Sequence, residues 1–353
     1  SAAQGHPRLQ ATPEPAVTMR RRTALLTLLA LAAAPVVHAR TPYLARSEVQ
    51  QFLNELVSSH GFERARAEHW FREARYSPSV ERLMQPAIPF GQRNWFEYRD
   101  RYVEPVRIQA GIAFWQAHAA ALARCEELLG VPAEILVAII GIETYFGRIT
   151  GNFRTLDVFT TLSFDYLRRA DFYRAEFVEF LLLARDQKRD PGTYRSSFAG
   201  AIGLPQFMPG SIRRWAVDFD GDGRIDLLGS PVDAIGSVAS FLVGHGWQRD
   251  LPIAFEVEAE EGIVDRLGRG ILAQRPWWSA LAEGVTGDAL LTLDTPVLVI
   301  DLPLVTPDGQ PGRAYRVGTV NFSAILHYNR SYFYATAVTE FAAALRERMN
   351  SGS

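Results

Sequence analysis

Cysteine and lysine are almost missing from this 353-residue chain, which has only Cys125 and Lys188 of these two types. A single cysteine cannot form an intrachain disulfide bond, so the sequence excludes a disulfide-stabilised fold. The cysteine continues a stripe of apolar residues at helical spacing: Ile108, Ile112, Trp115, Ala119 and Leu122. This position predicts a buried and unreactive thiol.

An excess of one charge sign is also missing. Without residues 1–39, the chain has 33 basic and 38 acidic residues. Nothing in this balance suggests a nucleic-acid partner, and none is expected. The chain is 48% hydrophobic and 22% charged, which excludes a disordered or fibrous protein and predicts a sizeable globular core.

One apolar run near the N-terminus reads as a targeting signal. Basic residues at 20–22, an apolar stretch at 24–37 and the small residue Ala39 follow the order of a secretory signal peptide. We expect cleavage after Ala39, which predicts a periplasmic protein without a lipid-anchor cysteine. The stretch is short for a membrane span, although an uncleaved anchor is the alternative.

Helical spacing dominates the chain up to Trp247. A helix is expected to begin at Ser47, which forms a capping-box pattern with Gln50. Further helices are expected at residues 62–74, 105–129, 171–188 and 233–243, and again at 321–326 and 331–349. Between Trp247 and residue 321, alternating residues at 253–257 and short branched runs at 290–293 and 297–300 predict a small β-rich insert.

Glu143 is the first candidate for chemistry. It follows an apolar run, residues 135–142, that is interrupted only by Gly141, so a helix here would be buried on every face. Burial raises the pKa of a carboxyl group, and a carboxylic acid that keeps its proton can protonate a glycosidic oxygen. The alternative is a buried ion pair between Glu143 and a nearby arginine, Arg148 or Arg154.

A second candidate is the segment 196–210, which is rich in glycine, alanine and proline. Such a composition favours a turn-rich wall that a ligand can approach closely. Ser197 and Gln206 could offer a hydroxyl and an amide to a sugar. A plain connection between helices is the alternative.

Four blocks, in order, resemble the membrane-bound lytic murein transglycosylase B family. They are residues 141–147 around Glu143, residues 199–209, residues 231–247, and residues 328–334. The resemblance covers most of residues 45–349. It implies an enzyme that cleaves the β-1,4 bond between N-acetylmuramic acid and N-acetylglucosamine in peptidoglycan, without water, to give 1,6-anhydromuramoyl products.

The fold that the resemblance implies is α+β and mainly α, with a lysozyme-like core. Together with the element pattern it predicts five parts: an upstream extension plus signal peptide at 1–39, an N-terminal helical domain at 40–130, a catalytic core at 131–250, a small β-rich domain at 251–320, and a C-terminal helical segment at 321–349 that contributes to the groove.

The resemblance also implies roles for individual residues. Glu143 would act as acid and then as base on the muramoyl C6 hydroxyl. Five residues would bind the glycan: Ser197, Gln206, Tyr328, Asn329 and Tyr334. No second carboxylate accompanies Glu143 in a recognisable motif, and Asp157 and Asp165 are the nearest downstream candidates. The acetamido group of the substrate could replace the missing nucleophile.

An acidic loop predicts a calcium site. Asp218, Asp220 and Asp222 stand at positions 1, 3 and 5 of an EF-hand pattern, with Gly223 at position 6. Position 12 is a glycine instead of glutamate, and the resemblance implies Asp233 as the later acid. Arg224 could contribute its main-chain carbonyl. The ion would be structural, and no catalytic cofactor is expected.

Two other functions stay open from the residues alone. A hydrolytic muramidase would use water in place of the C6 hydroxyl, and a non-catalytic peptidoglycan-binding module would not need an intact Glu143. The expected partners are peptidoglycan glycan strands, with cell-wall synthesis or division proteins as further candidates. The protein is expected to act as a monomer.

Overall fold

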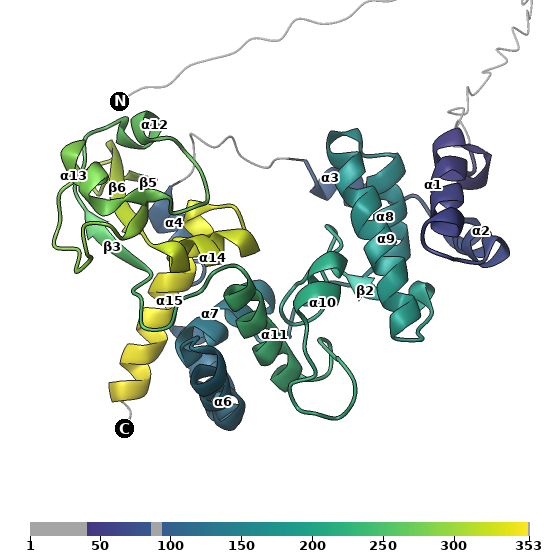
Figure 1. Cartoon of the computed structure of the whole chain (residues 1–353), viewed down its shortest axis with the longest axis horizontal. Helices are drawn as coiled ribbons and strands as arrows, with labels where there is room; N and C mark the ends of the chain where they lie inside the picture. Colours follow the sequence, from purple (N-terminus) through teal and green to yellow (C-terminus); the bar gives the residue numbers. More distant parts are fainter. Residues whose placement is uncertain (1–40, 86–93, 352–353) are drawn as a thin grey trace, which may run out of the picture. The chain divides into compact units, whose positions relative to one another are not determined.

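Helices make up most of the computed structural model, which describes residues 41–85 and 94–351 (Figure 1). The predicted signal peptide and its cleavage site fall outside these ranges. Within them, no helix combines the length and the apolar character needed to cross a membrane. From Pro42 onward the chain forms one compact unit, and the predicted domain limits inside it stay predictions.

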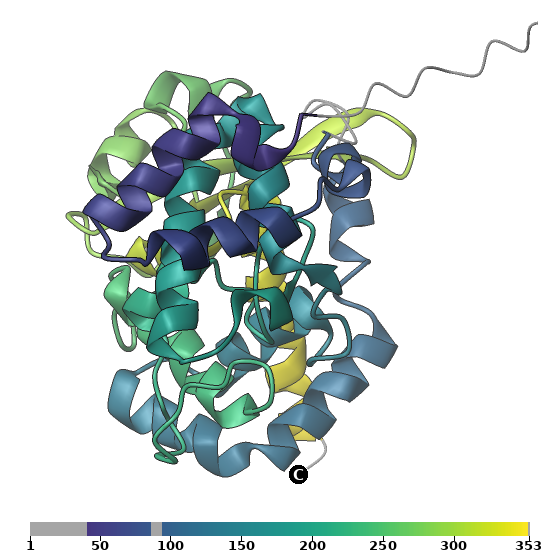
Figure 2. The ribbon, with the colours of Figure 1, turned by 90° about the vertical axis from the view of Figure 1, so that its right-hand side faces the viewer.

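The N-terminal helices are η1 (Tyr43–Ala45), α1 (Ser47–Ser58), α2 (Arg64–Glu73), α3 (Pro78–Leu83) and α4 (Trp95–Arg99). Aromatic rings hold α1 and α2 against the core. The ring of Phe52 in α1 lies 6.0 Å from that of Phe71 in α2 and 5.3 Å from that of Phe177 in α9 (Ala170–Asp186). These contacts join α1 and α2, in purple and dark blue in Figure 2, to the helices behind them. The predicted capping box is wrong, because Arg46 precedes the helix and the Ser47 side chain contacts Glu48.

The long helix expected at 105–129 is two helices, α5 (Pro105–Ala117) and α6 (Ala119–Leu129). The break falls at His118, whose φ of −119° and ψ of 22° are not helical. Gly130 ends α6 with a φ of 68°, as the sequence predicted. Cys125 is fully buried, and burial raises the pKa of its thiol to about 12, as expected for an inert core residue.

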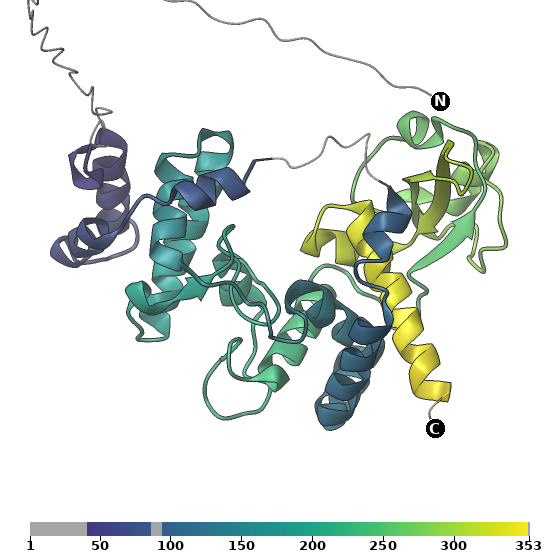
Figure 3. The same cartoon turned by 180° about the vertical axis from the view of Figure 1, so that it is seen from behind.

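Helix α7 (Ala133–Thr144) occupies the middle of the core. Its residues from Ala133 to Ile142 are all buried, as its apolar run predicted. It packs against α5, α6, α11 (Pro231–Gly244) and α15 (Tyr332–Ser351). Figure 3 shows α15, in yellow, beside the blue helices that precede and include α7.

Between α7 and α11, the chain pairs β1 (Phe153–Arg154) with β2 (Arg195–Ser196) and forms several helices. These helices are α8 (Thr155–Phe164), η3 (Leu167–Arg169), α9 (Ala170–Asp186), η4 (Pro191–Thr193) and α10 (Pro209–Trp215). The pairing aligns Phe153 with Ser196 and so places the glycine-rich segment that follows β2 near the end of α7.

The β-rich insert is a four-stranded antiparallel sheet with the order β3-β6-β5-β4. Its elements are β3 (Ala254–Val257), α12 (Ile263–Leu267), β4 (Arg275–Pro276), α13 (Trp277–Ala282), β5 (Pro296–Val305) and β6 (Pro311–Gly318). The branched run at 290–293 forms no strand, so that expectation is wrong. The chain then returns to helix in α14 (Val320–Tyr328) and α15, which buries Val338, Phe341 and Leu345 as predicted.

Candidate functional site

The chain reverses sharply just after Glu143. Helix α7 ends at Thr144, and the next three residues, Tyr145, Phe146 and Gly147, have φ values of 51°, 60° and 85°. Gly141 permits this reversal, because a Cβ atom there would lie 2.6 Å from the ring of Phe146. The sequence around Glu143 therefore builds a fixed turn that places its side chain at the C-terminal end of a buried helix.

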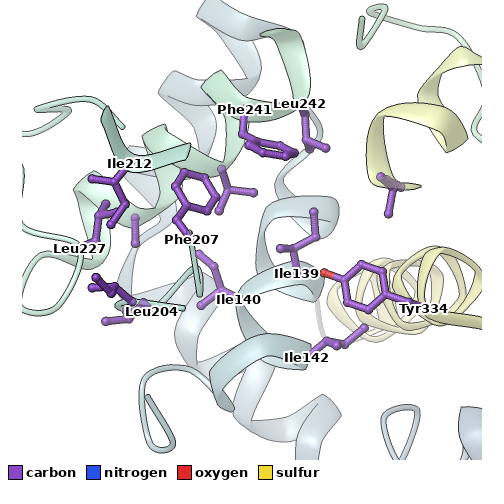
Figure 4. Packing of buried hydrophobic residues seen from close by; sticks show 14 of the residues in the cluster. Ile139, Ile140, Ile142, Leu204, Phe207, Ile212, Leu227, Phe241, Leu242 and Tyr334 are labelled. Carbon is purple, nitrogen blue, oxygen red and sulfur yellow. The ribbon is translucent and has the colours of Figure 1, made fainter. Parts of the chain in front are cut away.

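The carboxyl group of Glu143 meets a tyrosine from the other end of the chain. Its Oε1 accepts a hydrogen bond of 2.6 Å from the hydroxyl of Tyr334 on α15. Burial raises the pKa of Glu143 to about 7, although the Tyr334 hydrogen bond lowers it in part. Much of the group is therefore protonated near neutral pH. Figure 4 shows the Tyr334 ring directed toward α7, near Ile139 and Ile142.

The alternative of a buried ion pair is wrong for both arginines considered. Arg154 pairs with Glu73 and Asp157, and the Arg148 guanidinium lies 4.6 Å from the ring centre of Tyr145. Glu143 therefore has a neutral phenol as its partner, and an acid in this setting is poised to exchange its proton.

The two tyrosines stack on each other. The rings of Tyr328 and Tyr334 lie 6.3 Å apart with an interplanar angle of 15°. The Tyr328 hydroxyl donates a hydrogen bond to the carbonyl oxygen of Pro205. Burial, followed by the charge of Glu143, raises the pKa of both phenols well above the ordinary value, so both remain hydrogen-bond donors.

The other predicted glycan-binding residues have different surroundings. Gln206 donates from Nε2 to the carbonyl oxygens of Thr150 and Gly203, at 3.1 and 2.9 Å. The Ser197 Oγ accepts a 3.1 Å bond from the amide of Ala201. Asn329 is exposed just after α14. Of the five predicted residues, only Tyr334 has a recorded hydrogen bond with Glu143.

The two candidates for a second carboxylate, Asp157 and Asp165, have hydrogen-bond partners other than Glu143. Asp157 accepts hydrogen bonds from the Arg75 amide and the Arg154 side chain. Asp165 accepts a 2.7 Å bond from the Tyr43 hydroxyl and pairs with Arg46. Among residues 41–85 and 94–351, no carboxylate contributes to the pKa shift of Glu143.

The acidic loop brings together three of the five predicted metal residues. Asp218, Asp220 and Asp222 each offer an oxygen within 4.8 Å of the others. Convergent carboxylate oxygens are the donor set that suits calcium. The side chain of Arg224 is exposed, and its amide donates to Asp222.

Asp233 lies beneath this loop and is only 1% exposed. Its Oδ1 accepts bonds from the amides of Phe219 and Asp220, at 2.8 and 3.2 Å, and its Oδ2 accepts one of 2.9 Å from Asp226. Asp233 therefore fixes the loop backbone. The sequence interpretation missed Asp226, which caps the amides of Leu228 and Gly229, although position 9 of the EF-hand pattern was a signal for it.

Comparisons with known proteins agree with this site. The family described as "Transglycosylase SLT domain" matches residues 45–343. The chain is 39% identical to membrane-bound lytic murein transglycosylase B of Escherichia coli (strain K12) over 306 residues, which is 84% of this chain and 82% of that protein.

Solved structures of lytic transglycosylases are also similar to this chain. The soluble lytic transglycosylase SltB1 from Pseudomonas aeruginosa is 41% identical with a TM-score of 0.78, over 86% of this chain and 99% of that one. The Escherichia coli lytic transglycosylase Slt35 in complex with calcium is 39% identical with a TM-score of 0.73, over 85% of this chain and 92% of that one. The predicted lysozyme-like, mainly helical fold class is thereby confirmed. The chain belongs to the transglycosylase SLT domain family and is a lytic murein transglycosylase, an enzyme that acts on peptidoglycan.

Proposed function

We propose that this enzyme cleaves the β-1,4 bond between N-acetylmuramic acid and N-acetylglucosamine without water and releases 1,6-anhydromuramoyl products. Glu143 is the one acid and base of the reaction. The observation that supports this most directly is its isolation: its pKa is raised to about 7, and no second carboxylate of the described chain contributes to that shift.

In the first step, the protonated Glu143 gives its proton to the glycosidic oxygen while the bond from C1 to that oxygen breaks. The acetamido oxygen of the muramoyl residue bonds to C1 and holds the positive charge, because no carboxylate among residues 41–85 and 94–351 contributes to the pKa shift of Glu143 as a close second carboxylate would. In the second step, the Glu143 carboxylate takes the proton of the C6 hydroxyl. The C6 oxygen then bonds to C1 and displaces the acetamido oxygen, and Glu143 is again protonated.

The Tyr334 hydroxyl orients the Glu143 carboxyl by its hydrogen bond to Oε1. This leaves the second oxygen, Oε2, free to face the glycosidic bond. Tyr328 stacks against Tyr334 and fixes its ring. The glycan strand is bound by the five residues for which the family resemblance implies this role: Ser197, Gln206, Tyr328, Asn329 and Tyr334.

The acidic loop binds calcium through Asp218, Asp220 and Asp222, whose carboxylate oxygens converge. The Arg224 carbonyl and Asp233 remain candidates for further ligands, and the backbone hydrogen bonds of Asp233 hold the loop in a shape that suits them. The ion supplies rigidity to the loop and takes no part in the proton transfers. That a similar enzyme, Slt35, has been solved in complex with calcium supports this assignment.

The enzyme acts in the periplasm as a monomer, after export by the signal at residues 1–39. Peptidoglycan strands in that compartment are the substrate, and cell-wall synthesis or division proteins are candidate partners there. Its parts are an N-terminal helical domain at 40–130, a catalytic core at 131–250, a small β-rich domain at 251–320, and a C-terminal helical segment at 321–349 that contributes to the groove.

Mass spectrometry of fragments that residues 40–353 release from purified murein tests this proposal. Wild-type protein should give 1,6-anhydromuramoyl ends, and Glu143→Gln should give none. Reducing ends in place of anhydro ends would identify a hydrolytic muramidase. Retained binding without release by either protein would identify a non-catalytic module.

A further inference from the structure

The hydroxyl of Thr144, next to Glu143, joins two parts of the site. The Thr144 side chain is buried, with only 1% of the residue exposed. Its Oγ1 donates to the carbonyl oxygen of Leu204 at 2.9 Å, shares that proton with the more distant carbonyl oxygen of Ile140 at 3.3 Å, and accepts a 3.0 Å bond from the amide of Gly147. One hydroxyl therefore closes the reversal after α7 and ties it to the glycine-rich segment.

The carbonyl group that accepts this bond is itself fixed. Ile202 and Phe207 pair as an isolated bridge, so the residues between them form a tight turn. The amide of Leu204 donates a 2.8 Å bond to the carbonyl oxygen of Leu227, at the end of the acidic loop. The next carbonyl, on Pro205, accepts the hydroxyl of Tyr328. Figure 4 shows Leu204 beside Leu227, on the opposite side of Ile140 from Tyr334.

We propose that Thr144 is a positioning residue for Glu143. Glu143 lies in the last turn of α7, whose carbonyl groups find their hydrogen-bond partners in the reversal that follows: the Gly141 oxygen accepts from the amide of Tyr145, and the Thr144 oxygen from that of Ile149. The Thr144 hydroxyl anchors this turn on Leu204, while Tyr334 holds the Glu143 carboxyl from the other side. The inference rests on the proposed role of Glu143 as the acid.

Replacement by valine removes the hydroxyl while keeping nearly the same volume. The Leu204 carbonyl and the Gly147 amide would then lack their buried partner, and the turn would have to shift to find others. Serine keeps the hydroxyl and should keep both bonds. Thr160 offers a matched control, because it is also fully buried but donates only to Leu156 within its own helix, at 2.7 Å.

The experiment compares kcat, KM and the pH profile of anhydromuramoyl release by wild type, Thr144→Val, Thr144→Ser and Thr160→Val. A displaced Glu143 should lower kcat of Thr144→Val by about 10- to 100-fold with little change in KM. The alkaline limb of its profile should move to lower pH, because a carboxyl that shifts toward solvent ionises more easily. Thr144→Ser should recover most of the activity, and Thr160→Val should lower thermal stability alone.

Wild-type kcat and pH profile in Thr144→Val, or an equal kcat loss in Thr160→Val, would overturn the inference. If Thr144→Val does not fold, Thr144→Ala removes the same hydroxyl without adding a methyl group and carries the same test. Glu143→Gln separates the two claims: if that variant keeps its activity, the proposed role of Glu143 fails, whatever Thr144 does.

Discussion

The hydroxyl of Tyr334 donates a 2.6 Å hydrogen bond to Oε1 of Glu143, across 191 positions of the sequence. This bond stabilises the charged form of the carboxyl and so opposes the effect of burial, which raises its pKa to about 7. The balance between burial and this hydrogen bond sets the pKa of Glu143, which matters because the group must both release and regain a proton in one turnover. An uncharged hydrogen-bond donor such as Tyr334 can contact both the protonated and the ionised form of Glu143.

Replacing Tyr334 with phenylalanine should move the alkaline limb of kcat/KM to higher pH. The limb reports the acid of the free enzyme, which in wild type should titrate near pH 7. Without the donated bond, the pKa of Glu143 rises further, so the carboxyl group stays protonated up to a higher pH. Initial rates on soluble murein fragments from pH 4 to 9 would measure the shift.

Tyr332→Phe is the control for this shift. Tyr332 lies on the same helix, but its hydroxyl donates to the carbonyl oxygen of Gly270 at 2.8 Å and has no bond to Glu143. Its limb should coincide with that of wild type. The assignment of Glu143 as the titrating acid would be contradicted if the alkaline limb of kcat/KM in Tyr334→Phe stayed at the wild-type pH or moved to lower pH.

Glu143→Gln should increase the free energy of unfolding at alkaline pH. The folded-state pKa is raised from 4.5 to about 7, so the neutral carboxyl contributes stability that is complete below pH 4.5 and is lost as the pH rises through about 7. Glutamine has no charge to bury, and the gain above pH 8 should approach at most about 3 kcal/mol. Urea unfolding at pH 4 and pH 8 checks this, with pH 4 as the internal control where no such gain should occur. An equal effect at both values would show that burial does not disfavour the charged form.

Local patterns predicted most of the helices and the burial of the segment before Glu143, but they could not predict contacts between distant segments. The apolar run before Glu143 predicted a fully buried helix, because a helix with no polar face has no side to expose. The break at His118 was missed because flanking apolar residues keep helical spacing across it. No sequence spacing connects Thr144 with Leu204, because that bond depends on how two turns meet in space.

Calcium should stabilise the wild-type protein and not Asp218→Asn. An ion that binds only the folded state adds about 2.7 kcal/mol when it is present at about 100 times its Kd. Asp218 is one of the three convergent carboxylates, so an amide in its place removes charge from the donor set. Isothermal titration with calcium, and thermal unfolding with and without chelator, would measure both effects. Magnesium is the control ion, since it demands a tighter octahedral geometry. A wild-type protein that gives no binding heat and no thermal shift would remove the calcium assignment.

Asp233→Asn should loosen the acidic loop even without a metal ion. Both carboxylate oxygens accept backbone amides, Oδ1 from Phe219 and Oδ2 from Asp226. An asparagine must turn its NH2 group toward one of these donors, which leaves a buried amide without an acceptor at a cost of about 1–3 kcal/mol. Asp190→Asn is a suitable control: its exposed side chain accepts only the Gly192 amide, and the asparagine oxygen can keep that bond, so its effect should stay within about 0.5 kcal/mol. Urea unfolding in the presence of chelator compares the two variants. Equal stability of Asp233→Asn and wild type under these conditions would mean that Asp233 does not organise the loop.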